Sequence, residues 1–154
     1  MNRLFSPRRI APVLVALGVL GLALPASADD PLPFRGRADE MITDVRPIGD
    51  GLLLLTVTAK GEATYLGRFS GTETVVLNLA DGTFAGTRVF IAADGDRLFA
   101  DVEGAFTSAT TAEGTLRFTG GTGRFRNASG EADFDAVTPD GIHIALTFEG
   151  TIDF

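Results

Sequence analysis

The chain has 154 residues, a length that fits one compact domain, and it contains one His, one Lys and 19 Gly. It has no Cys, which excludes disulfides, thiol nucleophiles and thiolate metal sites. The net charge is −7, and residues 1–28 hold three Arg and no acid, so residues 29–154 carry 10 basic against 20 acidic side chains. This excess of negative charge argues against nucleic acid or an anionic membrane surface as a partner.

The first 28 residues are typical of a secretory signal peptide. A basic stretch ends at Arg9, an apolar run follows over 10–24, and Ala26-Ser27-Ala28 fits a cleavage site. A membrane-spanning helix needs about 20 apolar residues, so the shorter run predicts cleavage near Ala28 and no membrane insertion of the mature chain. Arg8-Arg9 leaves twin-arginine export as an alternative to the general secretory route, although the flanking residues fit that signal poorly. We expect a secreted or periplasmic protein.

Residues 29–35 contain Pro31 and Pro33 and are predicted to be an extended lead-in to one domain over 36–154. In that domain, four Asp-Gly dipeptides separate apolar runs. This dipeptide favours the type I′ turn of a β-hairpin, since both central positions of the turn need positive φ. The four are Asp50-Gly51, Asp81-Gly82, Asp94-Gly95 and Asp140-Gly141. They indicate a meander of antiparallel strands.

The apolar residues of the last run follow a two-residue period, which predicts one buried and one wet strand face. The residues on the apolar face are Ile142, Ile144, Leu146, Phe148, Ile152 and Phe154. Strands are predicted near 36–46, 52–60, 63–70, 73–79, 84–92, 97–107, 114–119 and 131–153, the last divided into a hairpin at Asp140-Gly141. Residues 63–79 form either two strands or one strand with a bulge at Gly71.

These patterns predict an all-β fold: a single antiparallel eight-stranded up-and-down β-barrel. After Asp29 no stretch has a convincing helical period. A two-layer sandwich is the alternative, and the barrel is favoured because hairpin follows hairpin without a long crossover connection.

The segment 119–130 interrupts the alternation with a glycine bend and a short turn, which would deliver Phe125 and Ala128 to one end of the barrel. Its sequence, Thr-Gly-Gly-Thr-Gly-Arg-Phe-Arg-Asn-Ala-Ser-Gly, resembles the Gly-Gly-Thr-Gly-x-Phe, x-x-Ala-x-Gly segment of the allene oxide cyclase and dirigent barrels. Tyr65-Leu66-Gly67-Arg68 resembles a Thr-x-Leu-Gly stretch of bacterial members, and the ending over 146–151 is similar in its aromatic content. The similarity covers residues 36–154 and suggests a bacterial secreted member.

This resemblance implies an eight-stranded barrel, often a homotrimer, with an apolar cavity open at one end and no metal or organic cofactor. Plant members cyclise an allene oxide of a fatty acid or direct the coupling of phenoxy radicals. The disulfide usual in plant dirigent proteins is absent here, and the catalytic residues of neither activity match positions of this sequence. The catalytic residues and the reaction therefore stay unassigned.

Charged residues interrupt apolar stretches at Glu40, Arg68, Arg88 and Arg117, and an inward charge is costly unless it is paired. The ordinary expectation is that each lies on the outer wall. Arg88 differs because Phe84 and Phe90 lie an even number of residues from it and so share its face of the strand. If these two rings face inward, Arg88 does too, and Glu40 would be its partner. The candidate ligand-cavity residues are Glu40, Phe84, Arg88, Phe90, Phe125 and Phe148.

Other motifs have ordinary structural explanations. His143 alternates onto the polar side of a strand, and no Gly-x-Ser-x-Gly elbow is present, which argues against a hydrolase. The glycines of 120–123 lack the Lys and the long helix of a phosphate loop. Neither Asp94-Gly95-Asp96 nor Asp133-x-Asp135 completes a calcium loop, so no metal site is expected.

Two functions fit these features. In the first, an exported barrel binds a small apolar or aromatic molecule in its interior. In the second, a cofactor-free isomerase, cyclase or dirigent-type enzyme holds a reactive intermediate in one conformer. Binding is favoured because the sequence supplies no recognisable acid–base pair, and assembly through strand edges is a weaker third hypothesis if the barrel closes. A cavity with a buried Arg or Glu near one end would favour the enzyme, and a filled interior would remove both ligand-using functions.

Overall fold

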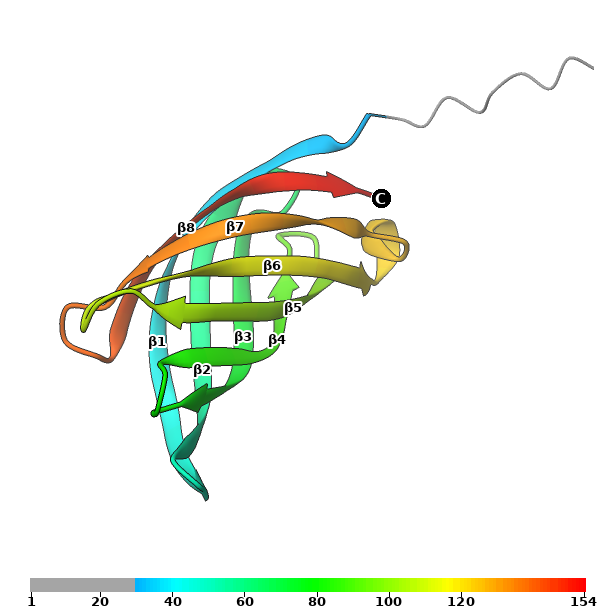
Figure 1. Cartoon of the computed structure of the whole chain (residues 1–154). Helices are drawn as coiled ribbons and strands as arrows, with labels where there is room; N and C mark the ends of the chain where they lie inside the picture. The colour runs from blue at the N-terminus through cyan, green and yellow to red at the C-terminus, as the bar shows by residue number, and fades with distance from the viewer. Residues whose placement is uncertain (1–29) are drawn as a thin grey trace, which may run out of the picture.

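The computed structural model describes residues 30–154, in which eight antiparallel strands close into a barrel (Figure 1). The strands follow chain order and β8 pairs with β1, so the sheet has no free edge. They are β1 (Leu32–Gly49), β2 (Leu52–Ala63), β3 (Gly67–Asn78), β4 (Thr83–Ile91), β5 (Arg97–Phe106), β6 (Thr111–Gly121), β7 (Ser129–Val137) and β8 (His143–Asp153), with a short 3-10 helix, η1 (Gly123–Phe125), before β7. The predicted all-β, eight-stranded up-and-down barrel is confirmed. The predicted signal peptide lies outside the described residues.

The first strand begins earlier than predicted. Leu32 pairs with Ile152 and Phe34 with Gly150, so most of the expected lead-in belongs to β1. The reason is burial: the side chain of Phe34 is fully buried in the barrel, which fixes this segment. Pro33 is tolerated because it lies near the start of the strand.

Residues 67–78 form one strand, β3, which settles the alternative that the sequence left open. The bulge expected at Gly71 is a wrong prediction, because the pairing with β2 and β4 runs through Gly71 without a register shift. A Cβ atom at this position would lie 2.9 Å from the Val89 carbonyl oxygen. Glycine is therefore needed here for the close approach of β4, not for a bulge.

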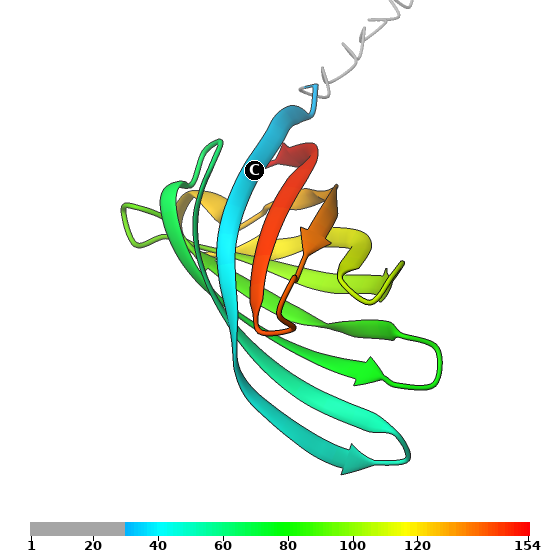
Figure 2. The same ribbon diagram turned by 90° about the vertical axis from the view of Figure 1, so that its left-hand side faces the viewer.

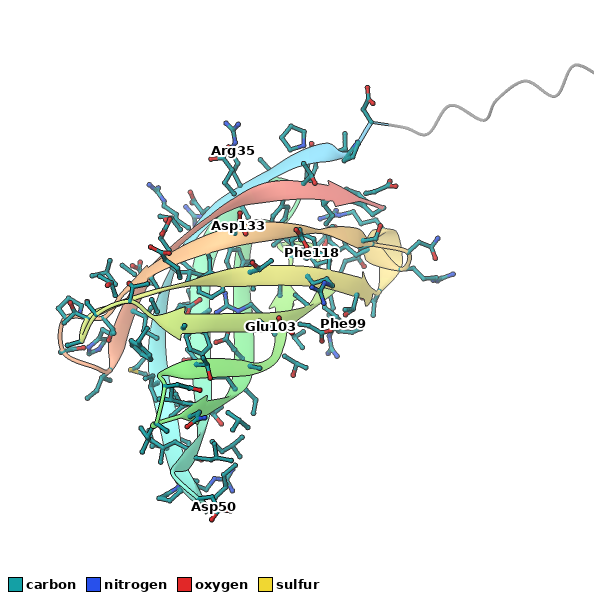
Figure 3. The ribbon with its side chains drawn as sticks, viewed as in Figure 1. Arg35, Asp50, Phe99, Glu103, Phe118 and Asp133 are labelled. Atoms are coloured by element: carbon teal, nitrogen blue, oxygen red, sulfur yellow. The ribbon has the colours of Figure 1, made fainter. Side chains whose placement is uncertain are left out.

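All four Asp-Gly hairpins are present, but only Asp50-Gly51 has the predicted turn type. Both of its residues have positive φ, 51° and 74°. The β1–β2 hairpin is long and extends past the neighbouring hairpins, with Asp50 at its tip (Figures 2 and 3). In the other three pairs the Asp side chain accepts a hydrogen bond from a backbone N–H two residues on, which makes an Asx turn. The pairs are Asp81 with Thr83, Asp94 with Asp96 and Asp140 with Ile142.

Phenylalanine rings fill the half of the barrel that carries η1. Phe34 stacks on Phe148 with ring centroids 5.4 Å apart, and Phe69 meets Phe90 edge to face at 5.2 Å. We call this region the aromatic end; its rings are Phe34, Phe69, Phe90, Phe118, Phe125 and Phe148. All six side chains are at most 5% exposed.

Several inward glycines lie opposite a phenylalanine on the neighbouring strand. In each such pair a Cβ atom on the glycine would come within 2.8 Å of the ring, so the ring occupies the place of the missing side chain. The pairs are Gly36–Phe148, Gly61–Phe69, Gly104–Phe84 and Gly114–Phe134. The barrel wall can therefore curve at the glycines while the phenylalanine rings keep the interior packed.

The predicted apolar face of the last strand is correct inside β8 and wrong beyond it. Leu146 and Phe148 are buried, whereas Ile142 is 50% and Phe154 37% exposed. Both exposed residues lie outside β8, so the alternating sequence pattern there does not correspond to a strand of the barrel. Arg68 and Arg117 are exposed on the outer wall, as expected.

Candidate functional site

The half of the barrel away from η1 contains a cavity of about 190 Å³. Ala109 in the β5–β6 loop and Gly141 in the β7–β8 loop line it and are exposed, so the cavity reaches the surface at this end. The polar residues of its lining are Glu40, Glu73, Arg88 and Thr138. The other lining residues are Ile42, Leu55, Val57, Val75, Leu77, Phe84, Phe106, Ala109, Ala112, Leu116, Phe134, Ala136, Gly141, Ile144 and Leu146.

Glu40, Glu73 and Arg88 meet at the inner end of the cavity, and we call them the charged cluster. Nη2 of Arg88 donates a hydrogen bond to Oε1 of Glu40 at 2.5 Å, and Nε of Arg88 lies 2.7 Å from Oε2 of Glu73. The side chains of Arg88 and Glu40 are each 2% exposed and that of Glu73 is 11% exposed. Arg88 precedes Phe90 of the aromatic end along β4, so the cluster separates the packed half of the barrel from the hollow half.

The strand register brings these three residues together from β1, β3 and β4. Glu73 pairs directly with Arg88 across β3 and β4. Glu40 lies two strands away from Glu73, and the neighbouring row runs from Glu40 through Ala59 to Gly71. Because Ala59 and Gly71 are small, they leave room for the long Arg88 side chain to reach across to β1.

Burial and charge act in opposite directions on the cluster. Burial raises the pKa of Glu40, the Arg88 guanidinium counteracts this, and the nearby Glu73 carboxylate adds to the rise. For Arg88, burial disfavours the charged form, but Glu73 and Glu40 more than offset it, and the pKa of Arg88 is raised. Arg88 therefore keeps its positive charge and holds both carboxyl groups at the cavity.

Three buried polar atoms of the lining have no hydrogen-bond partner among residues 30–154. They are Nη1 and Nε of Arg88 and the hydroxyl oxygen of Thr138, a residue only 8% exposed. Nε of Arg88 nevertheless lies 2.7 Å from Oε2 of Glu73. Buried polar groups in proteins are normally hydrogen-bonded, so these atoms leave hydrogen-bonding capacity unused at the cavity lining.

The predicted cavity residues fall into two groups. Glu40, Phe84 and Arg88 line the cavity, and Glu40 and Arg88 form the ion pair inferred from parity. The other three candidates, Phe90, Phe125 and Phe148, do not line this cavity: their rings lie in the aromatic end, packed on other side chains.

The sequence analysis missed Glu73. Its signal was present, because Glu73 shares parity with Val75 and Leu77 in the same strand and so faces inward with them. This parity is the same whether 63–79 is one strand or two, because Glu73 opens the predicted strand 73–79.

His143 is the first residue of β8 and does not line the cavity. Its Nδ1 lies 2.7 Å from Oδ2 of Asp140, and its backbone N–H donates to Oδ1 of the same residue. The side-chain hydrogen bond from His143, followed by the backbone N–H groups of His143 and Ile142, lowers the pKa of Asp140. Within residues 30–154 there is no group of three or more acidic or His side chains placed to hold a metal ion.

No helix among residues 30–154 is long and apolar enough to cross a membrane.

Comparisons with known proteins found little similarity. No family model matches the sequence, and no curated protein matches it. Among solved structures, the chain is similar to the pterocarpan synthase dirigent protein GePTS1, with 12% sequence identity, a TM-score of 0.47, and coverage of 94% of this chain and 95% of that one.

Proposed function

We propose that this barrel binds one small, mostly apolar molecule in its cavity. The observation that carries the proposal is an apolar-walled cavity of about 190 Å³ that ends at buried Arg88, whose Nη1 has no hydrogen-bond partner among the described residues. Ligand sites in proteins typically combine such apolar walls with a few well-placed polar groups. The apolar wall supplies affinity, and the charged cluster orients one polar end of the molecule.

The cavity volume limits the size of the ligand. A dry apolar cavity of about 150 Å³ holds a molecule as large as benzene. The volume of about 190 Å³ found here suits a single ring with a short substituent, or a chain with a similar number of atoms. A longer molecule would extend through the mouth between the 107–110 and 138–142 loops.

Native mass spectrometry and a matched pair of variants test the binding. Protein purified from its own host is expected to retain a small molecule, and the same spectrum reports whether the chain is the homotrimer that the resemblance implies. Acetophenone is then titrated into the protein by calorimetry. Ala136→Leu places extra atoms in the cavity and should abolish binding, whereas Ala145→Leu makes the same change on the exposed face of β8 and should not. Absence of both a retained molecule and any saturable binding would contradict the proposal.

A second candidate function is a cofactor-free isomerase, cyclase or dirigent-type enzyme. The buried Arg88 and Glu40 at the inner end of the cavity favour it, as expected for an enzyme, because the Glu40 carboxyl has a raised pKa and could exchange a proton with a bound molecule. This function builds on the binding proposed above, since an enzyme must hold the molecule that it converts. Glu40→Gln separates the two functions, since it preserves the size of the side chain but removes the exchangeable carboxyl proton. An enzyme would convert the bound molecule in the unaltered protein and only bind it in the Glu40→Gln variant, whereas a binding protein would leave the molecule unconverted in both.

We also propose that the barrel works outside the cytoplasm, after removal of residues 1–28. The basic, apolar and small-residue regions of the N-terminal sequence support this, with cleavage near Ala28. N-terminal sequencing of the protein recovered from its host is expected to start at Asp29. An intact Met1 on the native protein would contradict export by this route.

A further inference from the structure

The charged cluster has no unpaired positive charge that could bind an acidic ligand. Its single cation, Arg88, lies within 2.7 Å of carboxylate oxygens from both Glu40 and Glu73. Among the described residues that line the cavity, no other side chain is ionisable. The cluster carries one net negative charge when both glutamates are ionised, and none when one of them is protonated.

This charge count decides which polar group a ligand can bring to the inner end of the cavity. A ligand carboxylate would place another negative charge beside two buried carboxyl groups, with the only nearby cation already paired. Burying a charge without a partner is strongly unfavourable. A salt bridge between Arg88 and an acidic ligand would also require one of the existing ion pairs to break.

A neutral oxygen meets no such penalty. Nη1 of Arg88 is a buried donor without a partner among residues 30–154, and a carbonyl, ether or hydroxyl oxygen can accept its hydrogen bond without adding charge. Hydrogen bonds from a charged donor are stronger than those between neutral groups. The rest of the ligand then meets an apolar wall.

We propose that the cavity selects neutral molecules that carry a hydrogen-bond acceptor and rejects carboxylates of the same size. The inference rests on the proposed function and names the chemical class of its ligand: a small aryl or alkyl ketone, ether or alcohol, and not an acid. Glu40 and Glu73 act as specificity-determining residues, because they neutralise Arg88 before any ligand arrives.

Three probes of nearly equal size test this selection at neutral pH. Acetophenone carries a carbonyl oxygen, α-methylstyrene replaces that oxygen with CH₂, and benzoate is a carboxylate. Calorimetry is expected to show acetophenone binding tightest, with α-methylstyrene weaker by about fivefold or more and benzoate weaker by about tenfold or more. Benzoate binding within threefold of acetophenone would overturn the selection, as would α-methylstyrene binding as tightly as acetophenone.

A variant that removes one carboxylate of the charged cluster tests whether the cluster causes the rejection of acidic ligands. Glu73→Gln leaves Arg88 with a single carboxylate, so benzoate should gain about tenfold in affinity while acetophenone changes by less than about threefold. Glu103→Gln is the matched control, because it changes the charge of the chain equally on the outer wall (Figure 3). Unchanged benzoate binding in a folded Glu73→Gln protein would overturn the role of the charged cluster. If Glu73→Gln does not fold, the comparison of the three probes on the unaltered protein still decides the inference.

The outcomes also separate this inference from the proposed function. If α-methylstyrene and benzoate bind but acetophenone has no advantage, the cavity is a binding site and the selection is wrong. If none of the three binds and no small molecule is retained, the proposed function fails and the inference fails with it.

Discussion

Arg88 lies in the interior of the barrel only because two carboxyl groups accompany it. An isolated guanidinium buried to this extent would be strongly destabilising, and its ion pairs with Glu40 and Glu73 offset that cost without making the cluster more favourable than an apolar core. The cluster therefore contributes little net stability, although removal of Arg88 leaves two buried carboxyl groups without a cation. Its position at the inner end of the cavity suits a role in recognition better than a role in stability.

Replacing Arg88 tests this account. Arg88→Met leaves two buried carboxyl groups without a cation and should lower the free energy of unfolding by about 3 to 5 kcal/mol in urea denaturation. Combining it with Glu40→Gln and Glu73→Gln removes both carboxylates and should recover most of the loss. Arg117→Met on the outer wall is the control and should change stability by about 0.5 kcal/mol or less. A triple variant as unstable as Arg88→Met would show that the charges are not the cause.

The pKa of Glu40 predicts the sign of a pH dependence. Its pKa is raised in the folded protein from an ordinary value of 4.5, so the folded state keeps a proton that the unfolded state has lost. The stability linked to this group is fully present below pH 4.5 and declines as the pH rises through the folded pKa. Glu40→Gln should flatten this decline in urea denaturation measured from about pH 4.5 upward, whereas Glu103→Gln should leave it unchanged. An identical slope in the Glu40→Gln variant would assign the pH dependence to other groups.

Among the elements, β4 shows what the sequence could and could not predict. The two-residue period predicted that Phe84, Arg88 and Phe90 share one face of the strand, and the structure shows that this is the inner face. Parity gives no information about depth along the barrel axis, which depends on the register of all eight strands. Phe84 therefore lines the cavity and Phe90 packs in the aromatic end, although the two have the same sequence signature.

The turns show a similar limit. Asp-Gly correctly predicted where hairpins reverse, because glycine accepts positive φ. The turn type depended on whether the Asp side chain could accept a backbone N–H, as Asp140 does from Ile142. That choice depends on the loop around the dipeptide and not on the dipeptide alone.

Gly114 in β6 tests the pairing of inward glycines with phenylalanine. A Cβ atom here would lie 2.2 Å from the Glu103 carbonyl oxygen and 2.5 Å from the Phe134 ring. The ring could shift toward the cavity, but the backbone of β5 could not, so Gly114→Ala should cost about 3 kcal/mol of unfolding free energy. Gly141→Ala, at a turn with φ of +74° and no atom within 4 Å, should cost about 1 kcal/mol. Equal losses in thermal or urea denaturation would show that contact with the ring and backbone does not determine the difference.

The two halves of the barrel differ in how their interiors are filled. The aromatic end has a packed interior, and it holds β1 against β8 through the stacked rings of Phe34 and Phe148. The other half of the same closed sheet contains the cavity. The position of the charged cluster between the two halves lets the packed end support the polar groups that line the cavity.

Closure of the barrel can be tested at two successive positions of β8. Phe148 is 3% exposed and stacks on Phe34, so Phe148→Asp would bury an unpaired carboxylate at the β1–β8 seam and should abolish cooperative unfolding and the β-sheet circular dichroism signal. Glu149 points outward and makes a surface ion pair with Arg35, with both side chains more than 60% exposed. Because exposed ion pairs contribute about 1 kcal/mol or less, Glu149→Ala should shift the melting temperature only slightly. Comparable losses in the two variants would mean that β8 does not present alternate residues to the interior, and the closed barrel with its cavity would then be wrong.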